Sequence, residues 1–309
     1  MIKSIEEKIK NLKKEKNAII LAHYYQIPEI QDIADYVGDS YALAKYAQNT
    51  DADIIILAGV KFMAETAKVL NPSKRVFIPD MEAGCSLVDA APVEEFKNWI
   101  NIYHNPFVVT YINSSIEIKM LSDVIVTSSN AVKIVSKIPE DKTILFAPDK
   151  NLGNYVMQKT KRNMQIWDGH CYVHEQLKAQ QIINLKKQNP DAPVISHPEC
   201  SPTVLAMSDF IGSTSALLDY VKNTNYEKYI IATETGIIHQ MKKIKPNANF
   251  ILVPADESCS CNDCMYMKLN TLEKIYNNLT LENNEIILSD DIIQKAKIPI
   301  LRMMEMAEN

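Results

Sequence analysis

Three stretches of the chain repeat one arrangement of side chains that could move protons and bind anions. Their first position holds His23, Tyr111 or His197, which lie 88 and 86 residues apart, and the copies align without a gap. Only the third copy has a carboxylate two residues later, Glu199. A carboxylate at the end of a buried strand needs a partner or a role. Glu199 is therefore the first candidate for general acid and base chemistry.

The other members of the repeat offer a phenol, an amide and hydroxyls. Tyr25 and Asn113 take the place of Glu199 in the first two copies. A phenol can protonate an intermediate or simply pack as an amphipathic residue, and an amide can bind a carboxylate. Hydroxyls before helical patterns cap helices, whose free N–H groups also bind anions. Each copy has such a hydroxyl 17 residues after its first member: Ser40, Ser128 and Thr214.

Cysteines follow the last apolar run of each repeat. Cys85 and Cys171 lie 86 residues apart, and one of Cys259, Cys261 and Cys264 takes the third place. Three thiolates at equivalent positions would meet at one axis, where they suit a metal better than a disulfide. Zn²⁺ is one interpretation. An iron–sulfur cluster with three cysteine ligands and one open iron, acting as a Lewis acid, is the other.

The remaining cysteine positions leave alternatives open. Cys261 and Cys264 form a C-x-x-C pair, which suits a redox pair or a local metal clip. Cys200 and Cys259 have no counterpart in the other copies. We expect Cys200 in the core, because a lone cysteine is usually a small hydrophobe, and we assign no role to Cys259.

Alternating strand and helix patterns must position these residues. They predict an α/β fold of three similar units with short parallel sheets around a pseudo-threefold axis, with the active site at the centre. Ligands bind at the carboxyl ends of parallel strands, which is where the repeated polar pairs lie. The predicted units span residues 1–86, 87–172 and 173–309, the first with an N-terminal helix and the third with C-terminal helices.

Some element boundaries are specific expectations. A helix is predicted over 28–36, with Pro28 in its first turn. Ser289 is expected to cap the last helix, and Pro299 to kink or break it. The predicted strands cover 18–23, 53–60, 75–79, 107–110, 142–147, 164–167, 194–196, 228–233 and 249–254.

Composition excludes several classes of protein. The 309 residues carry a net charge of −5, so no basic surface suggests nucleic acid. With only 7 glycines the chain has neither a dinucleotide-binding nor a Walker A motif. The charged N-terminus is unlike a signal peptide, and the apolar runs are too short to span a membrane. We expect a cytoplasmic protein with reduced thiols.

The motifs together resemble the quinolinate synthase family over nearly the whole chain. The similar segments are LAHYYQ with GDS, AGCSLVDA, YINSS with TSSNA, W-x-G-x-C-x-V-H, HPEC, GSTS and C-x-x-M-K-L-N, in the family's order. The resemblance implies three αβα units around a pseudo-threefold axis. One departure is Met265, where the family commonly has proline; it leaves the ligand Cys264 in place.

The resemblance implies an enzyme of NAD biosynthesis, a transferase. Iminoaspartate would condense with dihydroxyacetone phosphate to give quinolinate, with loss of phosphate and water. One [4Fe–4S] cluster per chain would have three cysteine ligands and an open iron. The partners implied are these small molecules and, functionally, the enzyme that supplies iminoaspartate; neither nucleic acid nor membrane is expected.

The resemblance also implies roles for individual residues. The cluster ligands would be Cys85, Cys171 and Cys264. The catalytic residues would be Glu199, Tyr25, His23 and Tyr111. The substrate-binding residues would be His23, Ser40, Tyr111, Asn113, Ser128, His174, His197, Glu199, Ser213 and Thr214.

Two other hypotheses fit some of these features. A [4Fe–4S] hydro-lyase that dehydrates a small hydroxy acid would also need three cysteines and an open iron, but no site for a triose phosphate. A protein that binds a metal or anion without catalysis would keep all its measurable chemistry when Glu199 is changed.

Overall fold

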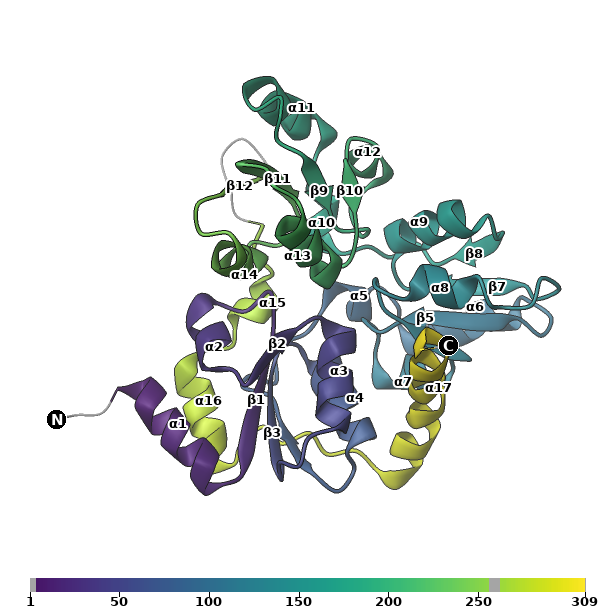
Figure 1. The fold of residues 1–309 in the computed structure, drawn as a ribbon. Helices are drawn as coiled ribbons and strands as arrows, with labels where there is room; N and C mark the ends of the chain where they lie inside the picture. The colour runs from purple at the N-terminus through teal and green to yellow at the C-terminus, as the bar shows by residue number, and fades with distance from the viewer. Residues whose placement is uncertain (1–3, 256–261, 309) are drawn as a thin grey trace.

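Three sheets of four parallel strands form the framework of the chain. The computed structural model describes residues 4–255 and 262–308. Each sheet has its strands in the order second, first, third, fourth along the sequence, so the three units share one topology. The units surround a common centre, with the third above the other two in Figure 1. The predicted α/β fold of three similar units is confirmed.

The strands are mostly buried, as parallel strands covered by helices must be. The first sheet consists of β1 (Ala18–His23), β2 (Tyr36–Gly38), β3 (Ile54–Ala58) and β4 (Arg75–Phe77). The second consists of β5 (Phe107–Tyr111), β6 (Val124–Val126), β7 (Ile144–Ala147) and β8 (Met164–Ile166). The third consists of β9 (Val194–Ser196), β10 (Phe210–Ile211), β11 (Lys228–Ala232) and β12 (Asn249–Leu252).

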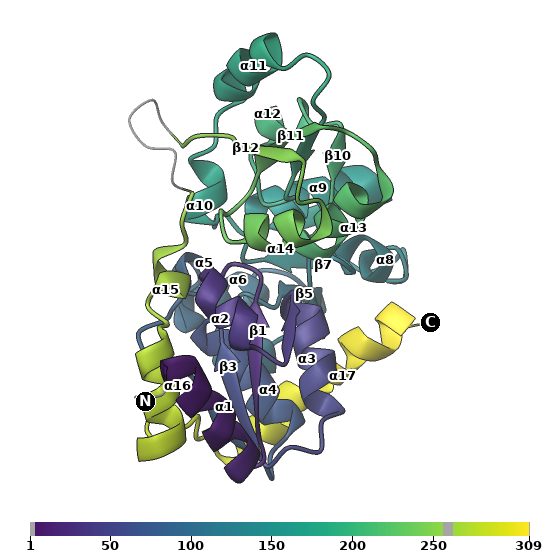
Figure 2. The same cartoon turned by 60° about the vertical axis from the view of Figure 1, so that its left-hand side comes forward.

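Helices connect the strands and cover the sheets on both sides (Figures 1 and 2). Those of the first unit are α1 (Ile5–Glu15), α2 (Pro28–Ile33), α3 (Ser40–Gln48) and α4 (Lys61–Leu70). Those around the second sheet are α5 (Ser86–Asp89), α6 (Val93–Asn101), α7 (Ile116–Met120), α8 (Ala131–Val135) and α9 (Lys150–Thr160). Those around the third are α10 (Tyr172–Glu175), α11 (Ala179–Gln188), α12 (Pro202–Leu205), α13 (Thr214–Asn223) and α14 (Ile237–Ile244).

The helix predicted over 28–36 was too long, because α2 ends at Ile33 and strand β2 follows. The reason is Asp35, whose backbone N–H donates to the Ile20 carbonyl at 2.8 Å. Its carboxylate accepts the Ile20 N–H at 2.7 Å, which holds the chain in position to pair with β1. The same double contact joins Asp123 to Val108 and Asp209 to Val194.

Three C-terminal helices complete the chain: α15 (Met265–Lys268), α16 (Leu272–Leu281) and α17 (Asp290–Glu308). Helix α16 lies beside α1 and packs Ile275 into the core beneath the first sheet (Figure 2). Helix α17 packs Ile300 into the large core shared by the first two units. The Ser289 hydroxyl accepts the Ile292 N–H at 3.4 Å, as predicted, but Pro299 does not break α17. No helix among the described residues has the length and apolarity needed to cross a membrane.

Replacing Asp209 tests the structural role of the repeated aspartates. Asp209→Ala leaves the Val194 N–H without its acceptor at 2.8 Å, so we expect the free energy of unfolding to fall by about 1–2 kcal/mol. Denaturant unfolding followed by circular dichroism measures the change. The control is Asp191→Ala, which removes a nearby exposed carboxylate and should have little effect. Equal stability of the two variants would contradict the role.

Candidate functional site

The carboxyl ends of the first strands of all three sheets open into one cavity. The convergence expected from the repeat is therefore present. Of the predicted site residues, these line the cavity: His23, Tyr25, Ser40, Cys85, Tyr111, Asn113, Ser128, Cys171, His174, His197, Glu199, Thr214 and Cys264.

Ser213 is the one predicted site residue that is not among the lining residues. Its hydroxyl instead caps α13 by accepting the Ala216 N–H at 3.3 Å. In the first and third copies the expected capping position was one residue late, because Asp39 caps α3 with its carboxylate and Ser213 caps α13. In the second copy Ser128 does not cap α8, whose N-cap residue is Asn130. Ser40 and Thr214 are the first residues of their helices, so their side chains are left to face the cavity.

His23 and His197 take equivalent orientations. The Nδ1 atom of His23 accepts the Tyr25 backbone N–H at 3.1 Å, and that of His197 accepts the Glu199 N–H at 3.4 Å. Burial is the main reason that the pKa values of both imidazoles fall to about 3. Both rings are therefore neutral at pH 7, with the proton on Nε2. In His197 this nitrogen lies 3.2 Å from the Ser128 hydroxyl.

Glu199 is buried, with 3% of its surface exposed. Its Oε2 atom lies 2.7 Å from Nδ1 of His174 and 3.7 Å from Nδ1 of His197. Burial acts to raise the pKa of this carboxyl, but His197, which gains its proton in the same acidic range, and His174 outweigh burial and hold the pKa at about 2. A hydrogen bond from the Tyr111 phenol acts in the same direction. The cavity thus contains a carboxylate that is ionised at neutral pH.

A chain of hydrogen bonds connects Glu199 to Tyr25. His174 Nε2 lies 2.9 Å from the Thr233 hydroxyl, which lies 2.8 Å from the Tyr25 hydroxyl. All these contacts are satisfied when Tyr25 donates to Thr233, Thr233 to His174, and His174 Nδ1–H to Glu199. Burial is the main reason that the pKa of Tyr25 is raised well above 10, so the phenol keeps its proton. The arrangement can pass a proton between the phenol and the carboxylate.

The thiols of Cys85, Cys171 and Cys264 are free and line the same cavity. Burial is the main reason that the pKa of each thiol is raised, and the nearby Glu199 carboxylate raises that of Cys171 further. Cys200, as expected, is in the core, where its Sγ contacts the Ala232 carbonyl. The predicted contribution of Cys259 and Cys261 lies outside the described residues.

This donor set fits a metal centre. Three soft thiols at one wall suit zinc or an iron–sulfur cluster, and a coordinated cation would favour loss of their protons. A second arrangement overlaps it, because Cys171, His174 and Glu199 have ligand atoms within 4.8 Å of one another. These mixed donors suit a single zinc ion. In the structure Nδ1 of His174 lies 2.7 Å from Glu199 and 3.3 Å from the Cys171 sulfur, so these three groups already contact one another.

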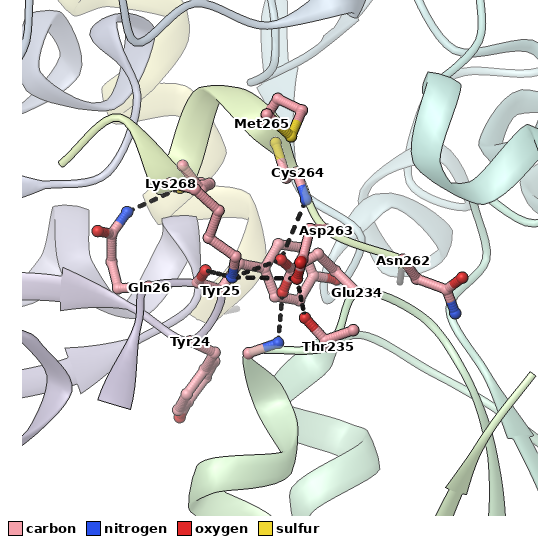
Figure 3. A network of polar contacts seen from close by, with 12 residues as sticks. Tyr24, Tyr25, Gln26, Glu234, Thr235, Asn262, Asp263, Cys264, Met265 and Lys268 are labelled. Atoms are coloured by element: carbon pink, nitrogen blue, oxygen red, sulfur yellow. Dashed lines mark hydrogen bonds and ion pairs between the residues drawn. The ribbon is translucent and has the colours of Figure 1, made fainter. Parts of the chain in front are cut away.

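Buried carboxylates hold the backbone of two of these cysteines. Asp149, which follows β7, accepts the Cys171 N–H at 3.2 Å. Glu234 follows β11, the equivalent strand, and accepts the Cys264 N–H at 3.1 Å. Figure 3 shows that Glu234 also pairs with Lys268, whose ammonium lies 2.8 Å from the carboxylate and 2.7 Å from the Tyr25 carbonyl.

Sequence analysis did not identify Thr233, Glu234 or Asp149. The pattern that identified the site residues after the first strand of each unit, polar residues directly after an apolar run, could also have identified these three. Thr233 and Glu234 end the run KYIIATE, and Asp149 ends ILFAPD. Strands β7 and β11 are the central neighbours of β5 and β9. Glu234 therefore lines the same cavity, whereas Thr233 and Asp149 contact the lining residues His174 and Cys171.

Comparison with known proteins places the chain among relatives of similar length. The family model described as Quinolinate synthetase A protein matches residues 7–305. The quinolinate synthase of Gloeothece citriformis is 54% identical over 300 residues, covering 97% of this chain and 93% of the relative. That of Trichodesmium erythraeum is 52% identical over 301 residues, with 97% and 93% covered. That of Microcystis aeruginosa is 54% identical over 299 residues, with 97% and 94% covered.

Gly236 allows the turn after Glu234 to contact the first unit closely. A Cβ atom at this position would lie 2.7 Å from the Tyr25 backbone, so Gly236→Ala should lower the free energy of unfolding by about 1–3 kcal/mol. Gly84→Ala is the control, because its Cβ would meet only the Tyr266 ring, at 3.3 Å. Denaturant unfolding compares the two. If Gly84→Ala were the more destabilised variant, the contact with Tyr25 would not be restrictive.

Proposed function

The chain belongs to the Quinolinate synthetase A protein family, and on that premise we propose that it is a quinolinate synthase. It condenses iminoaspartate with dihydroxyacetone phosphate to quinolinate, losing phosphate and water, and is thus a transferase. The observation that carries the proposal is the single cavity that the family-like motifs share. Its functional partner is the enzyme that supplies iminoaspartate.

Cys85, Cys171 and Cys264 would hold a [4Fe–4S] cluster with one open iron. When bound, that iron supplies Lewis acidity toward a substrate oxygen, which favours dehydration. The cavity also suits anionic substrates. Ser40 and Thr214 begin helices of 9 and 10 residues, whose N-termini favour carboxylate or phosphate.

The proton chemistry is assigned to the chain from Glu199 to Tyr25. Glu199 is ionised and can accept a proton from a carbon or nitrogen of the bound substrate. Tyr25 keeps its proton and can donate it to a leaving hydroxyl. The hydrogen bonds through Thr233 and His174, at 2.8 and 2.9 Å, hold the phenol and the carboxylate in position for these two steps. The neutral Nε2–H groups of His23 and His197 donate hydrogen bonds without adding charge.

An anaerobic assay of quinolinate from iminoaspartate and dihydroxyacetone phosphate tests the function directly. Glu199→Gln keeps the side-chain volume but removes the base, so turnover should fall about 10²- to 10⁴-fold while bound iron is retained. Glu175→Gln, a partly exposed acid not among the cavity-lining residues, is the control. Full turnover by Glu199→Gln would remove Glu199 from the mechanism. Dehydration of a hydroxy acid without quinolinate would favour the hydro-lyase hypothesis.

Metal analysis of anaerobically purified protein tests the cluster. We expect about four irons and matching sulfide per chain, with broad visible absorption. Cys171→Ser should lose them, whereas Cys200→Ser should keep them because Cys200 lies in the core. Tightly bound zinc without iron or sulfide would rule out the cluster and favour the group formed by Cys171, His174 and Glu199.

A further inference from the structure

The residues that directly follow the three cavity cysteines are hydrogen-bonded to one another. The Tyr172 backbone N–H donates to the Ser86 hydroxyl at 3.3 Å. The Tyr172 hydroxyl accepts the Met265 backbone N–H at 2.6 Å and donates to the Asp263 carbonyl at 3.3 Å. Tyr172 therefore contacts the segments that carry Cys85 and Cys264 while it is itself next to Cys171.

These contacts differ from those of the buried carboxylates. Asp149 fixes Cys171 to the second sheet, and Glu234 fixes Cys264 to the third, so each acts within its own unit. Tyr172 instead connects the segment that carries Cys171 to those that carry Cys85 and Cys264. Three ligands from three separate units need this kind of connection, because a metal site requires its ligands within about 0.5 Å of their working positions.

The surroundings of Tyr172 support a positioning role. Its ring is partly buried and meets Tyr266 edge to face, with the ring centroids 6.3 Å apart. Tyr266 in turn donates to the Asp89 carboxylate at 3.2 Å and lies against Gly84, beside Cys85. The Met265 side chain is 66% exposed. The contact between Met265 and the Tyr172 hydroxyl is therefore made by the backbone N–H of Met265 and not by its side chain.

We propose that Tyr172 is a positioning residue that joins the three cysteine segments into one cradle, with the bond from the Met265 N–H to its hydroxyl holding Cys264 in place. The metal-binding part of this inference rests on the proposed function. The geometric part concerns the protein without metal.

Two variants remove the same hydrogen bond from opposite sides. Tyr172→Phe removes the hydroxyl and keeps the ring. Met265→Pro removes the N–H together with the Met side chain. Its ring fits the backbone, because Met265 is the first residue of α15 and the preceding Cys264 is extended, with φ −78° and ψ 102°. Met265→Ala keeps the N–H and is the matched control.

The experiment measures anaerobic alkylation of each cysteine in the apoprotein by mass spectrometry, followed by the rate of iron loss from the loaded protein to a chelator. Tyr172→Phe and Met265→Pro should each speed alkylation of Cys264 and iron loss about 3- to 10-fold, as expected for one hydrogen bond. Met265→Ala should behave like the unmodified protein. The double variant Tyr172→Phe/Met265→Pro should be no faster than Tyr172→Phe alone, because that variant already lacks both bonds of the hydroxyl.

Buried Cys200 distinguishes positioning from general destabilisation. It is 0% exposed, so its alkylation reports opening of the core, and we expect no change there. Unchanged Cys264 alkylation in both single variants, or equal acceleration at Cys200, would overturn the proposal. So would additive effects in the double variant. Protein that binds no iron at all would instead contradict the proposed cluster, while the apoprotein alkylation would still decide the role of Tyr172.

Discussion

The centre of the protein depends on keeping the Glu199 carboxylate charged while only 3% of its surface is exposed. An unpaired buried charge would cost several kcal/mol. The hydrogen bonds from His174 and Tyr111 offset that cost, and both donors are themselves held by the fold. His174 is fixed by Thr233 at the end of β11, and Tyr111 ends β5. A carboxylate from the third unit therefore requires donors placed by other segments, which links the position of the units to the protonation state of the site.

The three units show which parts of a repeat are structural and which carry chemistry. The aspartates Asp35, Asp123 and Asp209 make the same two contacts in every unit, and they hold the edge strand of each sheet. By contrast, the position two residues after His23, Tyr111 or His197 differs between the units, which have Tyr25, Asn113 and Glu199 there. A threefold framework thus supplies three equivalent directions into one cavity, and the differences between the copies make the cavity chemically asymmetric.

Much of this arrangement could be predicted from the sequence because it depends on period and pattern. The repeat predicted the convergence of strand ends, and most strands begin or end within two residues of their predicted bounds. Three short strands were missed, since such short segments carry no alternation: Tyr36–Gly38, Val124–Val126 and Phe210–Ile211. Thr233 and Glu234 were missed because their roles depend on contacts more than 25 residues away in sequence. The position of α16 against α1 was also beyond prediction, because the apolar face of a helix does not show which other helix it packs against.

The packing of the C-terminal helices has a consequence for how the protein forms during translation. Ile275 of α16 completes the core of the first unit, and Ile300 of α17 completes the core of the first two. A nascent chain usually folds its N-terminal domain first, while the ribosome adds about 5–20 residues per second. Here the first unit leaves the ribosome with apolar surface that only the last helices can cover. Biogenesis therefore includes a period of exposed core, in which the nascent protein relies on chaperones or rapid completion of synthesis to avoid aggregation.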